Sequence, residues 1–225
     1  MITERMNKTD ITQYIGKYDI DHRLTKIVFS SDRVKKIQKN LKEYCRRQQS
    51  WPMIFKEPFR VTLEGNEYFC VLSVTGPKKG LDYNAYLRVY NERRYEYYTV
   101  PAGLGKDPGA ICSRFSAHFI DRFQSRCPGY SEDLHFLVSY LKDQKNIAFP
   151  VPLGLGPGTE IWRTTKSGVI LMTDWTYVSY YRKLSDFPEN RQESYKAYWK
   201  EHGRSLGEPS LSDLLEKMKY ADDNI

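Results

Sequence analysis

Between residues 59 and 100 the chain alternates apolar and polar side chains with a period of two, and this pattern constrains the fold more than any other stretch. The segments read FRVTL, a turn EGN and EYFCVLSVT, followed by YNAYLRVYN, a turn at Glu92-Arg93 and RYEYYTV. Such alternation, interrupted by short turn-forming sequences, is typical of antiparallel β-hairpins. We therefore expect a meander of antiparallel strands, with core candidates Val61, Leu63, Phe69, Val71, Leu87 and Val89.

A third hairpin and several helices accompany this meander. EIWRTT, the turn KSG and VILMTDWTYVSYY predict further strands between residues 161 and 181. Apolar residues recur at helical spacing in residues 32–49, 113–126 and 131–143, and again in two segments beyond Pro188; Ser31 or Asp32 caps the first helix and Ser131 the third. Because hairpins and helices are segregated along the chain, the predicted class is α+β, an antiparallel β-sheet with helices packed on it.

The 225 residues suit one large domain, or one domain with an appendage. We expect a weakly patterned N-terminal arm in residues 1–30, in which LTKIVF at residues 24–29 predicts a short strand. Residues 31–225 then form a single α+β domain. This domain can be subdivided into residues 31–110, a helix with β-hairpins, and residues 111–225, with two helices, a hairpin and C-terminal helices.

The composition limits the kind of protein and its partners. Hydrophobic residues make up 40% and charged residues 28%, as in an ordinary folded soluble protein. No segment approaches the roughly 18–20 apolar residues of a membrane helix, and MITERMNKTD has no apolar signal-peptide region. We therefore expect no membrane association and a cytoplasmic location. The net charge of +7 favours an anionic partner such as nucleic acid.

The sequence indicates neither a cofactor nor a metal. The four cysteines have no CxxC spacing and are expected to be free thiols, and the four histidines show no HxH, HxxxH or HExxH pattern. In the loop at 101–109, Asp107 follows Lys106 where a Walker A loop needs Ser or Thr. The glycines of PLGLGPG lead into a strand, whereas those of a Rossmann loop lead into a helix.

Two groups of residues are candidates for binding nucleic acid. The predicted helix at 32–49 carries seven Lys or Arg between Arg33 and Arg47 against the single acid Glu43, and its charges either face phosphates or form a solvated surface. In the meander, arginines are interleaved with tyrosines, which can stack on bases but are also simply good strand residues. The candidate contacts are Lys35, Lys39, Arg46, Arg88 and Arg94, with Tyr86, Tyr90, Tyr95 and Tyr97 as the aromatic residues.

The sequence CSRFSAHFIDRFQSR, residues 112–126, contains the candidate catalytic residues. On a helix, His118, Arg122 and Arg126 form a slanting row beside the apolar stripe. An imidazole can transfer protons near neutral pH, and guanidinium groups hold phosphate oxygens with forked hydrogen bonds. The alternative is that the histidine is a surface residue and that the arginines pair with acidic neighbours such as Asp121, Glu132 or Asp133.

With the helix and the hairpin that follow it, this HxxxRxxxR motif resembles small toxin-type ribonuclease domains of the RelE and barnase kind over residues 112–184. The whole chain also resembles bacterial proteins of the same layout to which no activity is attached. The resemblance implies helices packed on an antiparallel sheet, with His118, Arg122 and Arg126 joined by a hydroxyl of the sheet. Thr165 is the hydroxyl we select from Thr164, Thr165, Thr173 and Thr176.

A ribonuclease of this kind needs no metal, because the 2′-hydroxyl of RNA can attack the adjacent phosphate once a base removes its proton. The first hypothesis is therefore a metal-independent, toxin-like ribonuclease. The alternative is a non-catalytic module that binds RNA or another nucleic acid, or a protein partner. A metal-dependent hydrolase is a third and weaker hypothesis, because its ligands would have to come from distant segments.

Overall fold

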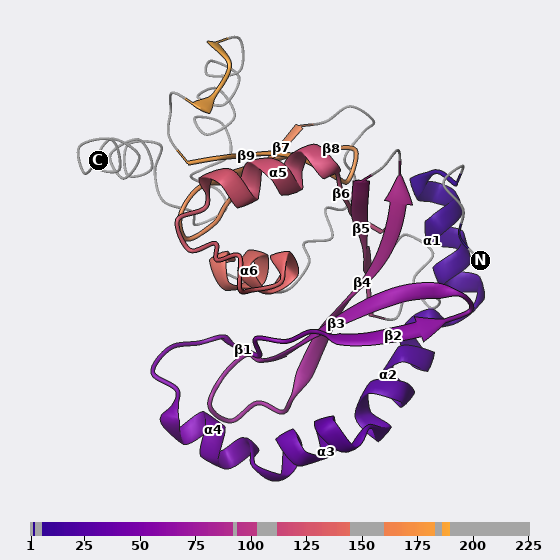
Figure 1. Ribbon diagram of the computed structural model, residues 1–225, viewed down its shortest axis with the longest axis vertical. Coiled ribbons are helices and arrows are strands. Elements are labelled where there is room, and N and C mark those ends of the chain that lie inside the picture. Colours follow the sequence, from indigo (N-terminus) through magenta and orange to yellow (C-terminus); the bar gives the residue numbers. More distant parts are fainter. Residues whose placement is uncertain are drawn as a thin grey trace.

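The computed structural model describes residues 2, 6–91, 94–102, 112–144, 160–182 and 186–189. Within these residues, six helices pack on a nine-stranded, mostly antiparallel sheet, which confirms the predicted α+β class (Figure 1). The predicted C-terminal helices and both glycine-containing loops lie largely or wholly outside the described residues. Among the helices that are described, none is long and apolar enough to cross a membrane.

The hairpins predicted from the period of two are present. The strands are β1 (Met53–Ile54), β2 (Phe59–Leu63), β3 (Asn66–Val74), β4 (Asp82–Asn91), β5 (Arg94–Val100), β6 (Arg114–Phe115), β7 (Glu160–Thr164), β8 (Val169–Thr173) and β9 (Thr176–Tyr181). Their order in the sheet is β1-β3-β4-β5-β6-β9-β8-β7, and β2 also pairs with β3. All pairs are antiparallel except β6 with β9, so the short β6 joins the first meander to the last hairpin.

The helices cover the two faces of the sheet separately. They are α1 (Lys8–Lys17), α2 (Ile20–Ser30), α3 (Asp32–Lys39), α4 (Leu41–Arg47), α5 (Ala117–Arg126) and α6 (Phe136–Asp143). The alternation of β3 divides the core in two: Tyr68, Cys70 and Leu72 pack with α1, α2 and α3, whereas Phe69 and Val71 pack with α5 and α6. Figure 1 shows α1 to α4 along one side of the sheet and α5 with α6 on the other.

Several details of the predicted elements were wrong. The strand predicted at residues 24–29 is part of α2, because Ile20, Leu24 and Val28 are buried along one side of a helix. Residues 8–30, predicted as part of a weakly patterned arm, form α1 and α2. The helix predicted at 32–49 is broken at Asn40 into α3 and α4.

The two later helices begin further along the chain than predicted. Residues 114–115 form β6, and α5 starts only after Ser116, whose hydroxyl accepts a hydrogen bond from the Phe119 N–H. The helix predicted at 131–143 is α6, which begins at Phe136 and has His135, not Ser131, as its N-cap. Of the predicted core residues, Leu63 and Val89 are only partly buried, and the others are buried. All four cysteines are free thiols, as predicted.

Candidate nucleic-acid interface

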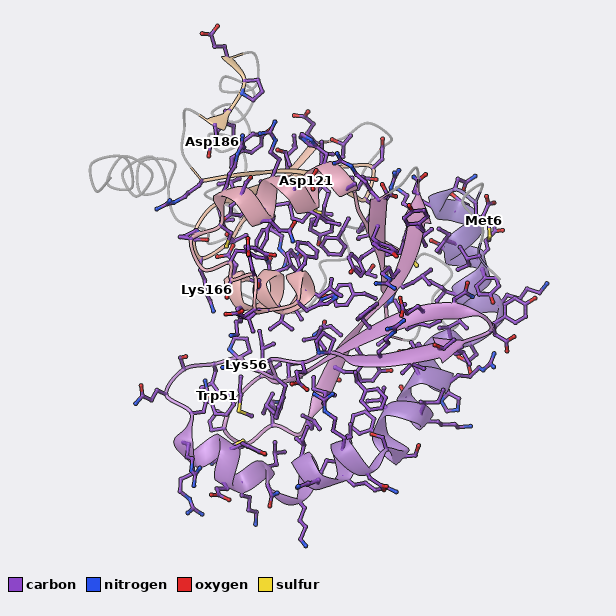
Figure 2. All side chains as sticks on the ribbon, in the orientation of Figure 1. Met6, Trp51, Lys56, Asp121, Lys166 and Asp186 are labelled. Atoms are coloured by element: carbon purple, nitrogen blue, oxygen red, sulfur yellow. The ribbon has the colours of Figure 1, made fainter. Side chains whose placement is uncertain are left out.

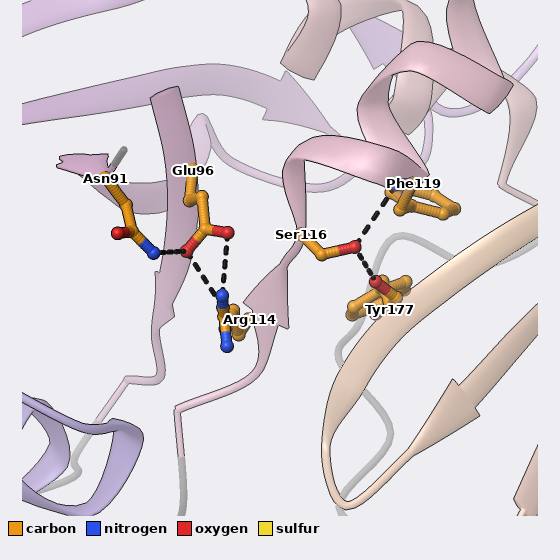
Figure 3. A network of polar contacts seen from close by, with 6 residues as sticks. All are labelled: Asn91, Glu96, Arg114, Ser116, Phe119 and Tyr177. Carbon is orange, nitrogen blue, oxygen red and sulfur yellow. Dashed lines mark hydrogen bonds and ion pairs between the residues drawn. The ribbon is translucent and has the colours of Figure 1, made fainter. Parts of the chain in front are cut away.

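The start of α5 is fixed by contacts at β6. Arg114 donates two hydrogen bonds to Glu96 of β5, Nε to Oε2 at 2.9 Å and a terminal nitrogen to Oε1 at 2.7 Å, and the Asn91 amide lies 3.5 Å from Oε2 (Figure 3). Ser116 donates a 2.8 Å hydrogen bond to the carbonyl oxygen of Tyr177 while it caps the helix. The first turn of α5 is thereby attached to both neighbours of β6.

The predicted apolar face of α5 is correct, since Phe119 and Phe123 are fully buried. His118 and Arg122 are exposed one turn apart, and in the described part of the chain neither side chain makes a hydrogen bond or ion pair. Between them in sequence, Asp121 pairs with Arg94 of β5 (Figure 2 labels Asp121 on α5). We call His118, Asp121 and Arg122 the α5 row.

Arg126, the last member of the predicted trio, is held by the sheet. Its guanidinium donates a 2.8 Å hydrogen bond to the carbonyl oxygen of Tyr180, lies 3.8 Å from a carboxylate oxygen of Asp186, and stands 5.7 Å from the centre of the Tyr181 ring. Only 19% of its side chain is exposed. These contacts give Arg126 a role in docking α5 onto β9.

The structure does not bring Thr165 to His118. Its buried hydroxyl accepts hydrogen bonds from the N–H groups of Ser167 and Gly168 within the β7–β8 turn. This turn lies at the C-terminal end of α5, because the Ser167 hydroxyl is 3.7 Å from the sulfur of Cys127. His118 is at the other end of the helix, about 13 Å away along the axis at 1.5 Å per residue.

Among the other candidate hydroxyls, Thr176 lies nearest in the topology to the start of α5. It pairs with Arg114 in the parallel β6–β9 register, two residues before the Ser116 cap, and with Thr173 across the β8–β9 turn. Thr164, at the end of β7, is buried. The next pair in this register, Phe115 and Tyr177, packs beneath α5, so the Thr176 side chain lies on the opposite face of the sheet. The structure therefore places neither Thr165 nor Thr176 beside His118.

The tyrosines of the meander fall into two classes. Tyr86 and Tyr97 belong to the core beneath α5 and α6, whereas Tyr90 and Tyr95 are 47% and 48% exposed. The two exposed rings face each other across β4 and β5, with 5.1 Å between their centres. The Arg88 guanidinium stacks 4.2 Å from the centre of the Tyr95 ring. We call Arg88, Tyr90 and Tyr95 the aromatic face.

The aromatic face carries an excess of positive charge. Glu67 forms ion pairs with both Arg88 and Arg60, so that one carboxylate is shared by two guanidinium groups. Beside it, Arg94 connects Tyr95 to the α5 row through its ion pair with Asp121. The aromatic face and the α5 row are therefore adjoining parts of one surface.

His135 lies at the inner edge of this surface and was not identified as a site residue from the sequence. Its Nδ1 accepts a hydrogen bond from the Leu137 N–H, its ring stacks on Phe69 with 4.8 Å between centres, and its Nε2 lies 3.4 Å from the Tyr97 hydroxyl. Burial, and secondarily the charge of Arg88, lower the pKa of His135 to about 4. His135 is therefore a neutral ring at physiological pH that supports the aromatic face.

The remaining predicted contacts lie elsewhere. Lys35, Lys39 and Arg46 are exposed on α3 and α4, with Lys36 and Lys42, and we call these five residues the basic rim. Because Val34 and Ile37 of α3 pack on the opposite side of the sheet from Phe69 and Arg88, the predicted set is divided between two surfaces. Arg88 and Arg94 belong to one surface and the basic rim to the other.

A second polar cluster is buried at the end of α5. The Ser167 hydroxyl donates to Asp143 at 2.5 Å and lies 2.7 Å from the Tyr180 hydroxyl, next to Cys127. Burial raises the pKa values of the Cys127 thiol and the Tyr180 hydroxyl, which keeps both protonated. Among the described residues, no three His, Cys, Asp or Glu side chains are placed to hold a metal ion.

No protein-family model matches this chain, and neither a curated protein nor a solved structure is significantly similar to it. The resemblance to toxin-type ribonucleases therefore stays a prediction.

Proposed function

We propose that the protein binds single-stranded nucleic acid, RNA in the first instance, on the aromatic face. The observation that carries this proposal is the stack of Arg88, whose side chain is 24% exposed, on the exposed ring of Tyr95, 4.2 Å from the ring centre, beside the equally exposed Tyr90. Single-stranded bases stack on aromatic side chains whatever their identity, and arginine adds a cation–π contact and a phosphate partner. Core packing does not account for two tyrosines that each leave almost half of their surface in water.

Electrostatics supports the same proposal. The chain carries a net charge of +7, and the aromatic face continues into Arg94 of β5 and into Arg122 of the adjoining α5 row. A phosphate backbone that follows stacked bases would meet these guanidinium groups. For about four phosphate contacts to a single strand, log–log salt dependence of the affinity should have a slope near −3.

The test is fluorescence anisotropy with a labelled single-stranded RNA, repeated with DNA of the same sequence and over a range of salt. Stacking is worth about 1–3 kcal/mol per base, so Tyr90→Ala and Tyr95→Ala should each weaken binding by about 5-fold to 100-fold. Tyr18→Ala is the matched control, because Tyr18 is 41% exposed and lies beside Lys17 on the opposite side of the sheet. Equal losses in all three variants, or none, would contradict the proposal.

Charge reversal separates the two basic surfaces. Lys35→Glu, Lys39→Glu and Arg46→Glu change only the basic rim, which lies across the sheet from the aromatic face. If the aromatic face is the binding surface, these variants should lower affinity only through long-range attraction, and this loss should disappear at high salt. A loss that persists at high salt would move the binding surface to α3 and α4.

Metal-independent cleavage of RNA is the second proposed function, and the adjoining exposed side chains of His118 and Arg122 favour it. Wild-type protein in EDTA should then leave 2′,3′-cyclic phosphate ends on RNA. His118→Ala should lower the rate by about 10²-fold or more, and Arg122→Lys should also impair it because the fork is lost. His22→Ala, which removes an exposed histidine of α2, is the control.

Each outcome distinguishes the hypotheses. If RNA stays intact in EDTA, or if His118→Ala cleaves as well as wild type, the catalytic proposal fails. Binding without cleavage supports the non-catalytic module. Absence of both favours a protein-interaction module, for which the exposed tyrosines would be equally suitable.

A further inference from the structure

The guanidinium group of Arg88 is held in place by side chains from both neighbouring strands. Phe69 of β3 and Tyr95 of β5 each place a ring against it, with 5.2 Å and 4.2 Å between the guanidinium carbon and the ring centres. Glu67, the partner of Arg88 in the β3–β4 register, forms an ion pair with one of its terminal nitrogens. Two rings and a carboxylate therefore determine where this guanidinium lies before any ligand binds.

Glu67 and Phe69 are themselves fixed. The second carboxylate oxygen of Glu67 pairs with Arg60 of β2, and the Glu67 side chain is only 15% exposed. On the core side of Phe69, the His135 ring stacks on it with 4.8 Å between ring centres. A ligand that binds Arg88 therefore does not have to order its side chain, and such preorganisation lowers the entropic cost of binding.

Arg88 keeps hydrogen-bond donors that the protein does not use. A guanidinium group has five N–H donors in one plane. In the described part of the chain, those of Arg88 have as acceptors a Glu67 oxygen and the Tyr97 hydroxyl, and no other hydrogen bond or ion pair engages its side chain. Because 24% of the side chain is exposed, the remaining N–H groups can reach a ligand.

The ring of Tyr95 brings a base next to these donors. Tyr95 is 48% exposed, and Arg88 stacks on the same ring. A base that stacks on the exposed part of this ring lies beside the guanidinium group and turns one edge towards its N–H groups. Arginine pairs with two neighbouring acceptors, which guanine presents as N7 and O6, whereas adenine has an amino donor in place of O6.

We propose that Arg88 gives the aromatic face a preference for guanine, which it recognises through N7 and O6, and that Glu67 is the positioning residue for Arg88. This inference rests on the proposed binding of single-stranded nucleic acid and adds base specificity to it. A contact of Arg88 with a phosphate would be the same for every base. The dependence of the affinity on the base therefore distinguishes the two roles of Arg88.

Fluorescence anisotropy with short labelled RNAs, all uridine except for the central base, tests the proposal. The central base is guanine, inosine, 7-deazaguanine, adenine or cytosine. Inosine lacks the 2-amino group of guanine but keeps N7 and O6, whereas 7-deazaguanine loses N7. Guanine and inosine should bind about 10-fold more tightly than the other three, which corresponds to 1.4 kcal/mol and lies in the range of a bidentate contact.

Protein variants identify the residue that reads the base. Arg88→Lys keeps the charge but loses the fork, so the RNAs should still bind and the preference for guanine over adenine should fall to about 1. Arg94→Lys is the matched control, because Arg94 is 62% exposed and pairs with Asp121; it should weaken the binding of all five RNAs alike and keep the preference. Glu67→Gln should lower the preference itself, a ratio that a general loss of folded protein would not change.

Circular dichroism checks that the variants are folded, and the comparison of guanine with 7-deazaguanine on the wild type keeps the test decisive if Arg88→Lys is not. The proposal is overturned if adenine, cytosine or 7-deazaguanine binds as tightly as guanine, or if folded Arg88→Lys keeps the preference. If one of these results occurs while Tyr95→Ala still weakens binding, only the assignment of Arg88 fails and the proposed function stands. If no RNA binds, both fail.

Discussion

The ion pair between Glu96 and Arg114 offers the sharpest test of how the fold holds α5 in place. Glu96→Gln keeps the shape of the side chain but removes its charge. The two hydrogen bonds that Arg114 donates then no longer have a carboxylate as their acceptor. Those bonds are the main reason why the pKa of Arg114 is raised. The side chain of Glu96 is 6% exposed and that of Arg114 is 34% exposed.

The exposed fractions of Glu96 and Arg114 determine how much Glu96→Gln should lower the free energy of unfolding. Breaking a fully buried pair costs about 3–5 kcal/mol, and an exposed pair contributes about 0–1 kcal/mol. Because Arg114 keeps part of its surface in water, we expect Glu96→Gln to lower the free energy of unfolding by about 2 kcal/mol. For a chain of this size each kcal/mol shifts Tm by about 2–4 °C, so Tm should fall by about 4–8 °C.

Differential scanning calorimetry measures this shift, and Glu43→Gln is the matched control. Glu43 pairs with Arg47 at 2.5 Å, but both side chains are more than half exposed, at 55% and 78%. An exposed helix pair contributes about 0.3–0.5 kcal/mol, so the control should lower Tm by no more than about 2 °C. Equal shifts in the two variants would refute the reasoning. In a double-mutant cycle, Glu96→Gln with Arg114→Met should cost less than the two separate losses together, because both remove one interaction.

Two further variants test the packing around the candidate site. A Cβ at Gly168 would lie 2.6 Å from both the Tyr180 hydroxyl and the Tyr181 carbonyl oxygen, so Gly168→Ala should lower the free energy of unfolding by about 1–3 kcal/mol, measured by urea unfolding, because it disturbs the pairing of β8 with β9. An unfolding free energy equal to that of wild type would mean that β9 shifts to accommodate the added methyl group without loss of stability. Burial lowers the pKa of His135 to about 4, so the folded protein keeps it neutral while the unfolded chain, with an ordinary pKa near 6.5, takes up a proton. The contribution of His135 to the free energy of unfolding should therefore be fully present above about pH 6.5. It should fall by about 2 kcal/mol as the pH approaches 4, once the partial exposure of the ring is allowed for. His135→Asn, which can still cap α6, should remove this part of the acid loss in unfolding curves, and an unchanged pH dependence would exclude His135 as its source.

The long hairpin strands were predictable because a period of two is hard to imitate over many residues, whereas the starts of the helices were less predictable. Phe115, Phe119 and Phe123 are four residues apart and all fully buried, which is typical of one helical stripe. Phe115 nevertheless belongs to β6 and stacks on Tyr177 with 4.2 Å between ring centres. A buried strand residue at the right spacing before a helix cannot be distinguished from its first turn by periodicity.

The candidate site was predictable in its residue types but not in its exposure. Tyr86 and Tyr90 lie on the same face of β4, as do Tyr95 and Tyr97 on β5, so the sequence gives no reason to separate them. They differ because α5 and α6 cover this face only as far as Tyr86 and Tyr97. The extent of such cover is a tertiary property.

The same is true of the basic residues. In the sequence, nothing distinguishes Arg122 from Arg126 as a candidate site residue. In the structure, the last turn of α5 contacts the end of β9, where the Arg126 guanidinium donates a hydrogen bond to the Tyr180 carbonyl oxygen. Lys39 lies on α3, which packs against one face of the sheet, whereas the Arg88 side chain lies on the other face, next to Phe69. The order of charged residues along the sequence does not show on which face of the sheet each side chain lies.

The contiguity of the aromatic face with the α5 row leads to a final prediction that separates binding from cleavage. β6 pairs with Tyr97 and Tyr98 of β5, and the Arg94–Asp121 ion pair joins the same strand to α5, so an RNA stacked on Tyr95 would continue towards α5, which carries Arg122 and His118. If both proposed functions hold, Tyr95→Ala should weaken RNA binding and, at low RNA concentration, cleavage by the same factor. His118→Ala should lower the cleavage rate and leave the anisotropy titration unchanged, because a proton-transferring group contributes in the transition state and little to ground-state binding. A parallel loss of binding and cleavage in His118→Ala would assign this histidine to RNA binding and remove the support for catalysis at the α5 row.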